Sequence, residues 1–413
     1  MNTPRLDLIL VTVALSLSLS ATGCGDDGGA SADAGPTGPC TGTYGQAWPD
    51  DDNAEFCMLP WDTTKPEMVL TECGEVFENC SEAGPTPDFS CLDNPGTPPA
   101  TPAMVTMTGY VDVFSSGPNA NQARIQVFRA SQLDGVADPD TVTPIAQTDV
   151  VLNDTTLVNA RACPSETDFM QGRCVLPTND CGGQCDKVLN AGSFCYQTTC
   201  EDLQRWEVEY AIPNVPTNEF LIVRSVGLNA SGEPQVIGNT WSPLIQYNVF
   251  LATNDAECVD SLDRDCIDTT NAIYQSDANL LSSQDYTTIP TSAGLSAGIT
   301  PGNGGVAGEI HDCNSKRIQH AQIGFSLDRD PRVLVFFNGN PVKTLPRLQQ
   351  AAQGTNLLGL YSGLDISPGP IEVNTVGVSG GALKEIGRFR AKIWPDSVTL
   401  LRIGGGRPAQ PAP

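Results

Sequence analysis

The chain has 413 residues and is strongly acidic, with 22 Lys and Arg against 48 Asp and Glu and a formal net charge of −26 at pH 7. Proteins bind nucleic acids by neutralising phosphates with Lys and Arg, so this charge excludes DNA and RNA as partners. The acidic excess is distributed unevenly along the chain. Residues 301–413 hold twelve Lys and Arg and eight Asp and Glu, a net charge of +4 (12 − 8).

The first predicted element is an export signal. Residues 8–20, LILVTVALSLSLS, form an uncharged run that follows a single base, Arg5. A membrane-spanning helix needs about 20 apolar residues, whereas a shorter run suits the apolar core of a secretory signal. Small residues then lead directly to Cys24. We therefore expect residues 1–23 to be a signal peptide.

Cys24 and its surroundings resemble the cleavage site of bacterial lipoproteins. In that family, cleavage makes the cysteine the new N-terminus and its sulfur takes a diacylglycerol. Ala21 departs from the family pattern, in which Leu is commoner, and an ordinary signal cleaved after Gly23 is the alternative. The resemblance implies lipidation of Cys24, a membrane as partner through the lipid anchor, and a place in the bacterial cell envelope, at the outer membrane or the cell surface.

The residues after Cys24 predict a flexible tether. Residues 24–39 are mostly Gly, Ala, Asp, Ser and Pro, with no large apolar side chain. Such a segment cannot bury enough surface to offset the entropy cost of ordering it. Acyl chains contribute about 0.8 kcal/mol per buried methylene, so the tether would join a stable membrane anchor to a folded body.

The other fourteen cysteines are predicted to form disulfides, because their number is even and exported proteins fold in oxidising surroundings. Their spacing favours a local bridge between Cys258 and Cys266. Parity then indicates that Cys313 pairs with a cysteine of the N-terminal segment, residues 40–102. The pairing is otherwise open for the predicted disulfide cysteines, which are Cys40, Cys57, Cys73, Cys80, Cys91, Cys163, Cys174, Cys181, Cys185, Cys195, Cys200, Cys258, Cys266 and Cys313.

A repeated pattern of alternating strands predicts two similar β-rich units. Two stretches within residues 105–127 alternate as half-buried strands do, and the same pattern recurs after residue 304. Gly308 aligns with Gly109, and Ala321 aligns with Ala123. We therefore expect one hairpin-like unit that occurs twice.

Both copies also share a turn. Asn214 in the first copy corresponds to Asp365 in the second, and each precedes a turn and an apolar strand. Pro368 and Gly369 favour a type II turn, because proline fixes one dihedral angle and glycine accepts the positive φ that follows. The first copy has Asn218 in place of this glycine, and Asn also tolerates a left-handed turn position.

The first copy is longer because it contains a cysteine-rich insertion, residues 163–200. Six cysteines fall within 38 residues that include few apolar side chains. We expect three disulfides to hold this segment, each contributing roughly 2–4 kcal/mol. A zinc site at Cys181 and Cys185 is the competing interpretation, which an oxidising compartment disfavours.

The repeated pattern resembles the carboxypeptidase regulatory-like domain, a transthyretin-like β-sandwich that is frequent in exported bacterial lipoproteins. The resemblance covers residues 105–250, without the insertion, and residues 304–404. It implies an all-β fold with two transthyretin-like or Ig-like β-sandwiches plus disulfide-rich irregular segments. The expected parts are a signal peptide (1–23), a tether (24–39), a Cys-rich segment that leans on the first sandwich (40–102), a first sandwich (103–255) with its insertion (163–200), a connector (256–302), a second sandwich (303–404) and a disordered tail (405–413).

Residues that could carry catalytic chemistry are sparse. The only two histidines are His311 and His320. They flank the predicted turn of the second copy, and with Asp312 they are candidate metal ligands, although ordinary loop side chains are the alternative. Metallocarboxypeptidases that carry the resembled module use a separate zinc domain, whose motif is missing here. A G-x-S-x-G nucleophile motif is also missing.

Calcium and sugars are two further ligand classes that the sequence leaves open. Acidic stretches at residues 50–53, 138–140 and 263–265 offer oxygen ligands for calcium, but none has the spacing of an EF-hand loop. Solubility outside the cell is the alternative explanation of the acidic residues.

Four aromatic residues could form platforms for sugars or could fill the two cores. The alternation around Trp206 favours the core interpretation. The four are Trp206, Trp241, Tyr247 and Trp394.

Together these features predict a membrane-anchored exported lipoprotein that acts as a non-enzymatic binding or structural module for a protein or glycan ligand, without a cofactor. The alternatives are a carbohydrate-binding or calcium-dependent adhesin, and a hydrolase with an unrecognised site. Aromatic side chains exposed on one face would favour the adhesin. A pocket that gathers both histidines with carboxylates would favour the hydrolase.

Overall fold

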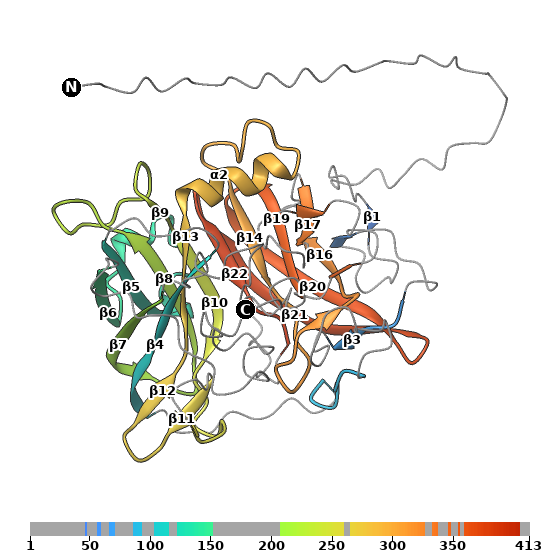
Figure 1. The fold of residues 1–413 in the computed structure, drawn as a ribbon, viewed down its shortest axis with the longest axis horizontal. Coiled ribbons are helices and arrows are strands. Elements are labelled where there is room, and N and C mark those ends of the chain that lie inside the picture. The colour runs from blue at the N-terminus through green and yellow to red at the C-terminus, as the bar shows by residue number, and fades with distance from the viewer. Residues whose placement is uncertain are drawn as a thin grey trace, which may run out of the picture. The chain divides into compact units, whose positions relative to one another are not determined.

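The computed structural model describes residues 46–47, 56–58, 66–70, 86–92, 103–114, 122–151, 207–259, 265–326, 333–337, 346–347, 354–355 and 359–404. All of them belong to one unit, residues 36–413. None of the helices within these ranges is long and apolar enough to cross a membrane. Strands dominate the described chain, which confirms the predicted all-β fold (Figure 1).

The first sandwich places two sets of strands around one core. Its strands are β4 (Met104–Phe114), β5 (Gln122–Arg129), β6 (Ala146–Val151), β7 (Glu207–Pro216), β8 (Phe220–Gly227), β9 (Trp241–Ser242), β10 (Leu244–Phe250), β11 (Cys266–Asp268), β12 (Ile273–Gln275) and β13 (Ala278–Ser282). One set is a six-stranded sheet in the order β11-β12-β4-β13-β9, with β7 paired to β4, and the other runs β10-β8-β5-β6. Alternating residues of both sets, such as Met107 of β4 and Ile125 of β5, meet in this core.

The second sandwich has the same plan. Its strands are β14 (Gly304–Glu309), β15 (Ile318–Gln319), β16 (Gln322–Ser326), β17 (Val333–Phe337), β18 (Pro346–Arg347), β19 (Leu360–Ile366), β20 (Gly369–Ser379), β21 (Ala382–Ile393) and β22 (Val398–Leu401). One set runs β18-β17-β19-β14-β22, and β16-β20-β21 belong to the facing sheet. Val306 of β14 and Ile323 of β16 lie in the shared core.

The two sandwiches share one continuous sheet. β22 runs parallel to β10, with Leu244 opposite Val398, and this pairing joins both sets of strands into a nine-stranded sheet. The middle of that sheet is covered on both faces, since Val223 of β8 lies in the first core while its neighbour Ile222 lies in the second. Burial on both faces explains why the first half of β8, Phe220–Val223, is apolar throughout rather than alternating.

Gly109 in the first copy lies where no other residue fits. It is opposite Tyr210 of β7, and a Cβ atom built on it would lie 1.9 Å from the carbonyl oxygen of Ser276. The hydroxyl of Tyr210 donates a hydrogen bond of 2.6 Å to the same oxygen. The backbone between β12 and β13 therefore passes directly over the glycine, and the tyrosine holds it there.

The second copy repeats this arrangement. Gly308 is opposite Tyr361 of β19, and a Cβ atom on it would lie 1.9 Å from the carbonyl oxygen of Leu401. Tyr361 donates to that oxygen at 2.9 Å. The predicted repeat is thus confirmed at the level of single contacts, because the aligned glycines have the same neighbours in both sandwiches.

The left-handed position predicted at Asn218 is confirmed, and the aligned residues that precede the two turns, Asn214 and Asp365, are left-handed as well. Asn214 and Asp365 both have a φ of 61°, and Asn218 has a φ of 58°. These values lie in the left-handed region, which Asn and Asp tolerate better than most residues. Gly369 follows Pro368 with a positive φ of 139° and begins β20, so the predicted type II turn, which needs a φ of about 80° at this glycine, is not confirmed.

The expected hairpin is wrong in both copies. β4 and β5 belong to different sheets, and so do β14 and β16. Each pair carries apolar residues that face one another across the core instead of lying side by side. The connection therefore crosses from one layer of the sandwich to the other, which alternating sequence patterns alone do not distinguish from a turn within one sheet.

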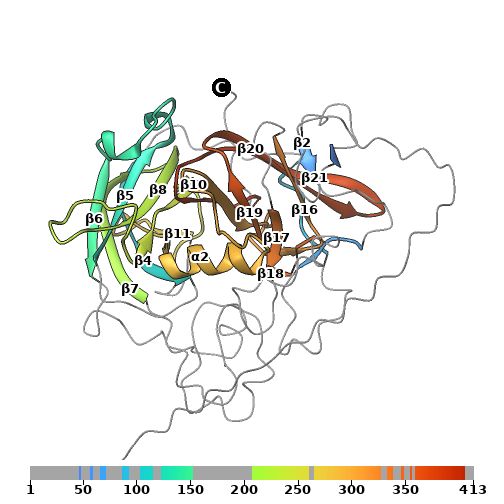
Figure 2. The same cartoon turned by 90° about the horizontal axis from the view of Figure 1, so that it is seen from above.

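Residues 256–302, which we expected to be a connector, hold three strands of the first sandwich. β12 and β13 both run parallel to β4, in the place that β22 takes beside β14. Ser276 and Asp277 separate the two strands and interrupt their alternation, so the pattern did not predict them. Helix α2 (Ser283–Ser292) follows, capped by Ser282, and lies across one end of the strands (Figure 2).

The N-terminal segment contacts the second sandwich, not the first as expected. β1 (Gln46–Ala47) pairs with β2 (Phe56–Met58), which pairs with β16, and β3 (Val69–Leu70) pairs with β15. Met68 is buried where Gly377 of β20 carries no side chain. The absence of a Cβ atom at that glycine leaves the space that the methionine fills.

Candidate functional site

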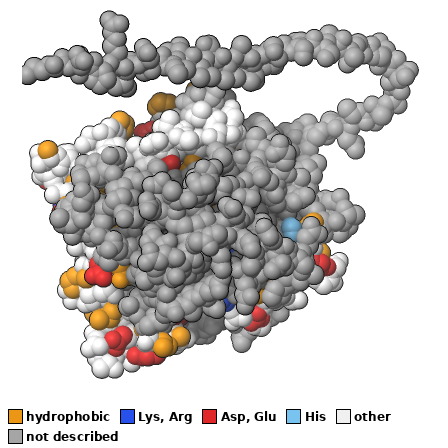
Figure 3. All heavy atoms as spheres, in the orientation of Figure 1, with side chains coloured by type: hydrophobic (Ala, Val, Ile, Leu, Met, Phe, Trp, Pro, Cys, Tyr) orange, Lys and Arg blue, Asp and Glu red, His pale blue; other side chains and the backbone are white. Residues whose placement is uncertain are grey.

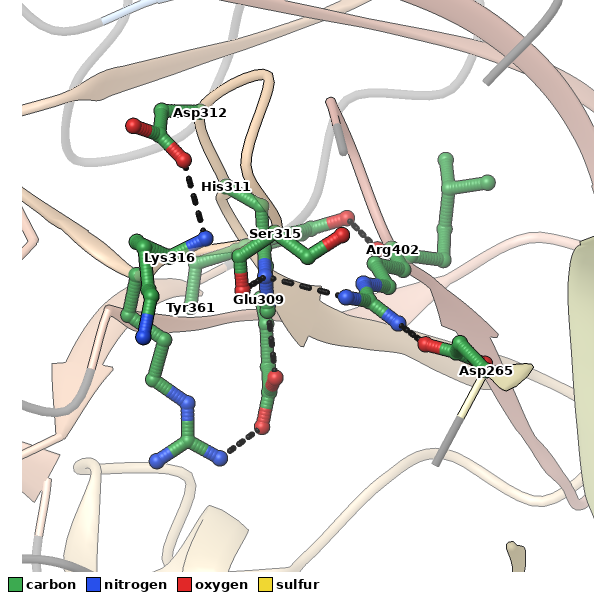
Figure 4. A network of polar contacts seen from close by, with 10 residues as sticks. Asp265, Glu309, His311, Asp312, Ser315, Lys316, Tyr361 and Arg402 are labelled. Carbon is green, nitrogen blue, oxygen red and sulfur yellow. Dashed lines mark hydrogen bonds and ion pairs between the residues drawn. The ribbon is translucent and has the colours of Figure 1, made fainter. Parts of the chain in front are cut away.

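His311 is the centre of a buried polar network just beyond β14 (Figure 4). Its Nε2 lies 2.8 Å from Oε2 of Glu309, and its Nδ1 lies 2.8 Å from the carbonyl oxygen of Ser315. Arg402, which follows β22, places Nη2 3.2 Å from the same Nδ1. Both ring nitrogens of His311 are therefore engaged by the protein.

Two ion pairs extend the network. Arg402 Nη1 pairs with Oδ2 of Asp265, and Arg317 Nη2 pairs with Oε1 of Glu309. Asp265 comes directly before β11 of the first sandwich, and Arg402 directly after β22 of the second. The ion pair of Arg402 with Asp265 therefore joins the second sandwich to the first.

Asp312 supports the turn beside this network. Its Oδ1 accepts hydrogen bonds from the backbone N–H groups of Asn314 and Lys316, at 3.0 Å and 2.9 Å. Its Oδ2 accepts one from the N–H of Asp88, at 2.9 Å. Three backbone donors therefore occupy the carboxylate that we considered as a metal ligand.

The candidate metal site of two histidines and Asp312 is not assembled. His320 lies between β15 and β16 with a φ of 64°, and its backbone N–H donates to the carbonyl oxygen of Thr355. Within the ranges that the structure describes, no three His, Cys, Asp or Glu side chains gather closely enough to hold a metal ion.

The charges around His311 shift its protonation and that of Glu309. Burial lowers the pKa of His311, and the positive charge of Arg402 lowers it further. Burial acts to raise the pKa of Glu309, but the charge of Arg317 and the hydrogen bond from His311 hold that pKa well below its usual value. A neutral His311 has a single ring N–H, so it donates either from Nε2 to Glu309 or from Nδ1 to the carbonyl oxygen of Ser315, and not to both.

These pKa shifts predict a loss of stability in mild acid. The unfolded chain protonates its histidines near pH 6.5, whereas folded His311 resists protonation to a lower pH. The unfolded state therefore binds more protons as the pH falls below about 6.5, and the free energy of unfolding decreases. We expect His311→Gln to flatten this decrease in urea titrations at several pH values between 7 and 5.

His320→Gln is the matched control for this prediction, because it removes the other histidine of the chain and leaves the network intact. It should retain the His311 contribution to the slope. Equal slopes in wild type and His311→Gln would show that His311 is not the group responsible.

The N-terminal segment closes over the turn that carries Asp312. Cys91 and Cys313 form a disulfide across 222 residues. The backbone N–H of Cys313 donates to the carbonyl oxygen of Asp88 at 2.9 Å. A second disulfide joins Cys258 and Cys266. Both predicted pairings are confirmed. The even number of cysteines had indicated that Cys313 pairs with a cysteine of the N-terminal segment, and that cysteine is Cys91.

Most other predicted cysteine sites fall outside the described side chains. The lipidation site Cys24 is among them, as is the cysteine-rich insertion with its alternative zinc site. Those not described are Cys24, Cys40, Cys57, Cys73, Cys80, Cys163, Cys174, Cys181, Cys185, Cys195 and Cys200.

The acidic stretches that we considered for calcium have structural partners where they are described. Asp138 caps the 3-10 helix η4 (Pro139–Thr141) by accepting from the N–H of Asp140. Asp140 in turn binds both Nη atoms of Arg224, whose side chain is 1% exposed. Asp265 pairs with Arg402. Residues 50–53 and 263–264 lie outside the described ranges.

The described aromatic residues fill the cores. Trp241 and Trp394 are each 1% exposed. The indole Nε1–H of Trp394 donates to the hydroxyl of Tyr247 at 3.0 Å inside the second core. The core interpretation is therefore confirmed for these three residues, whereas Trp206 lies outside the described ranges.

Sequence reasoning found His311 but missed the residues that engage it. Arg402 and Asp265 lie far from it in sequence, at the ends of strands whose partners were unknown. Glu309 and Arg317 were the sequence signal from which part of this network could have been predicted. They flank His311 at a spacing that two strands joined by a short turn would bring together, and they carry opposite charges.

Comparison with known proteins gives few relatives. No family model matches the chain, and no curated protein matches it. Similar solved structures include a leucine-rich repeat protein from Bacteroides thetaiotaomicron, the minor pilin of Streptococcus agalactiae and the TIE protein of Bacillus anthracis.

These similarities are distant. Sequence identities are 6%, 10% and 6%, and the matches cover 74%, 75% and 74% of this chain. They cover 27%, 99% and 35% of the other chains, so this chain spans less than two thirds of the first and third. TM-scores of 0.18, 0.16 and 0.15 are too low to support an argument from any of them.

Proposed function

We propose that this protein is an exported bacterial lipoprotein, anchored through Cys24, whose joined β-sandwiches act as a non-enzymatic binding or structural module. The observation that carries the proposal is the network of His311. Its charged groups are engaged in joining chain segments, with Arg402 bound to Asp265 across the two sandwiches and Arg317 bound to Glu309. Buried groups held in this way stabilise one arrangement of the chain.

Two further observations support the proposal. The disulfides Cys91–Cys313 and Cys258–Cys266 fit a protein that folds in an oxidising compartment. The paired contacts of Gly109 and Gly308 support the assignment of both sandwiches to one module type, for which we propose the carboxypeptidase regulatory-like domain. A sandwich of this kind binds through its loops and edges, which leaves the cores free to stabilise it.

The anchor is tested by Cys24→Ser in the full-length protein produced in a bacterial host. We expect the wild-type protein in the membrane fraction, with an intact mass that begins at Cys24 and includes acyl chains. The variant should lose the acyl mass and leave the membrane fraction, because the acyl chains on Cys24 are the proposed membrane anchor. The double variant Cys258→Ser/Cys266→Ser also removes cysteines, those of a disulfide, and should remain anchored. A wild-type protein without lipid would contradict the proposal.

The binding role is tested separately by chemical crosslinking on intact membranes, followed by mass spectrometry of the captured complexes. A stoichiometric protein or glycan partner is the expected result. Hydrolytic turnover by the purified protein that His311→Gln abolishes would instead support the hydrolase alternative.

A further inference from the structure

Arg224 is a buried cation in the middle of β8. Its side chain is 1% exposed, and it lies on the same face of the strand as Ile222. Nη1 donates a hydrogen bond of 2.9 Å to Oε1 of Gln126, the residue opposite it on β5. Nε is also buried, and it has no hydrogen-bond partner among the described residues. The guanidinium is therefore enclosed by protein and keeps one donor that the described chain does not use.

The counter-ion of Arg224 comes from the surface. Oδ1 and Oδ2 of Asp140 accept hydrogen bonds from Nη1 and Nη2, at 2.5 Å and 3.2 Å. The side chain of Asp140 is 33% exposed, so solvent reaches this carboxylate although it does not reach the guanidinium. A carboxylate held by two guanidinium nitrogens is also the arrangement in which arginine recognises the carboxylates of ligands. Asp140 thus occupies the position that a ligand carboxylate would take.

The loop that carries Asp140 is longer than its connection requires. β5 and β6 are adjacent antiparallel strands, which two to five residues can join, but residues 130–145 lie between them. Compact surface loops of about this length are frequently functional. The loop is also held away from Arg224, since Leu133 is buried and Nζ of Lys392 donates to the carbonyl oxygen of Val136. These contacts keep the loop attached when Asp140 moves aside.

The module itself does not require a charge at this place. Because Ala123 aligns with Ala321, Gln126 corresponds to Gly324 in the second sandwich. The residue opposite Gly324 on β20 is Asn374, so the pair that corresponds to Gln126 and Arg224 is uncharged. Replacing a buried ion pair by uncharged residues is often neutral or stabilising. Stability of the sandwich is therefore a weak reason for an arginine here.

We infer that Arg224 binds the carboxylate of a small organic acid and that Asp140 occupies this site in the ligand-free protein. The ligand must be small, because it reaches the enclosed guanidinium only where the Asp140 carboxylate now lies. Binding exchanges one carboxylate for another, so the buried charge stays paired throughout. This site is additional to the proposed partner-binding role and does not depend on it.

Acetate is the probe that tests the inference, measured by saturation-transfer NMR on the purified full-length oxidised protein. We expect saturable binding to the wild type. Asp140→Asn should bind acetate at least about tenfold more tightly, because an internal occupant lowers the apparent affinity by the fraction of time that the site is open. Arg224→Gln should not bind acetate. Arg224→Lys should bind it more weakly than the wild type, since lysine keeps the charge but loses the two-pronged geometry.

The double variant Arg124→Gln/Asp149→Asn is the matched control. It removes another arginine–aspartate pair of the first sandwich, in which Nε of Arg124 lies 2.6 Å from Oδ1 of Asp149, and should bind acetate as the wild type does. General affinity for anions is not expected of a chain with a net charge of −26. Acidic side chains also appear at several places on the face shown in Figure 3, where few basic ones do. Chloride at equal ionic strength serves as the reference for every titration.

Four outcomes would overturn the inference. Acetate binding that persists in Arg224→Gln would place the site elsewhere, and binding that Asp140→Asn leaves unchanged would show that Asp140 is not its occupant. Binding to Asp140→Asn without any to the wild type would show a fixed counter-ion that acetate merely replaces. Absence of binding to both proteins would make the pair structural. Near-UV circular dichroism confirms that each variant is folded, and if Arg224→Gln does not fold, Arg224→Lys decides, since equal binding by it and the wild type would contradict the inference.

Discussion

Replacing both Cys91 and Cys313 with serine will lower the free energy of unfolding by about 5 kcal/mol. The disulfide closes a loop of 222 residues, and the stabilisation expected from restricting the unfolded chain increases with loop length. The bond also holds the residues around Asp88 against the turn at Asp312. Urea unfolding followed by tryptophan fluorescence measures the effect.

The double variant Cys258→Ser/Cys266→Ser is the natural control for this prediction. Its disulfide closes a loop of only eight residues, so its loss should cost about half as much. Equal costs for the two variants would show that loop length is not the source of the stabilisation. Hydrogen exchange adds a local readout, since only loss of Cys91–Cys313 should increase exchange in β15 and β16.

The features of the fold that were predictable from sequence are those set by a few local residues. Asn218 marks a left-handed turn position, with a φ of 58°, because Asn tolerates positive φ better than most residues do. Gly109 and Gly308 served to align the two copies, because each is a glycine within an alternating strand. The turn signal depends on the backbone at the residue itself, whereas the requirement for glycine at the other two positions comes from the distant backbone of Ser276 and Leu401.

The features that were not predictable depend on partners far along the chain. An alternating strand has the same pattern whichever sheet it joins, so the assignment of β4 and β5 to facing sheets left no trace in the sequence. The pairing of β10 with β22 joins residues separated by about 150 positions. The N-terminal segment crosses to the second sandwich for a similar reason, through the short strand β3 and Met68.

The candidate site illustrates the same limit. His311 was evident because histidine is rare in this chain. Its role was not, because that role is set by Arg402, which contacts His311, and by Asp265 of the first sandwich, which pairs with Arg402. A histidine beside an aspartate is compatible with a metal site or with a structural joint, and only the positions of the surrounding charges separate the two.

Gly308→Ala will destabilise the second sandwich by about 3 kcal/mol or more. The added methyl group would lie 1.9 Å from the carbonyl oxygen of Leu401, and backbone on both sides leaves little room to relax. β14 and β22 would have to separate, which weakens the sheet that joins the two sandwiches. Overpacking in a core costs 1–3 kcal/mol and occasionally more. Urea unfolding at neutral pH measures the change.

Two controls separate crowding from other effects at this glycine. Gly135→Ala adds the same methyl group at a φ of 69° with no atom within 4 Å, and should cost about 1 kcal/mol from backbone strain alone. Tyr361→Phe removes the hydrogen bond to Leu401 without adding an atom, and should cost about 1 kcal/mol. Because Gly109 meets the carbonyl oxygen of Ser276 at the same distance, Gly109→Ala should match Gly308→Ala. A small effect in one copy alone would show that the two glycines are not equivalent.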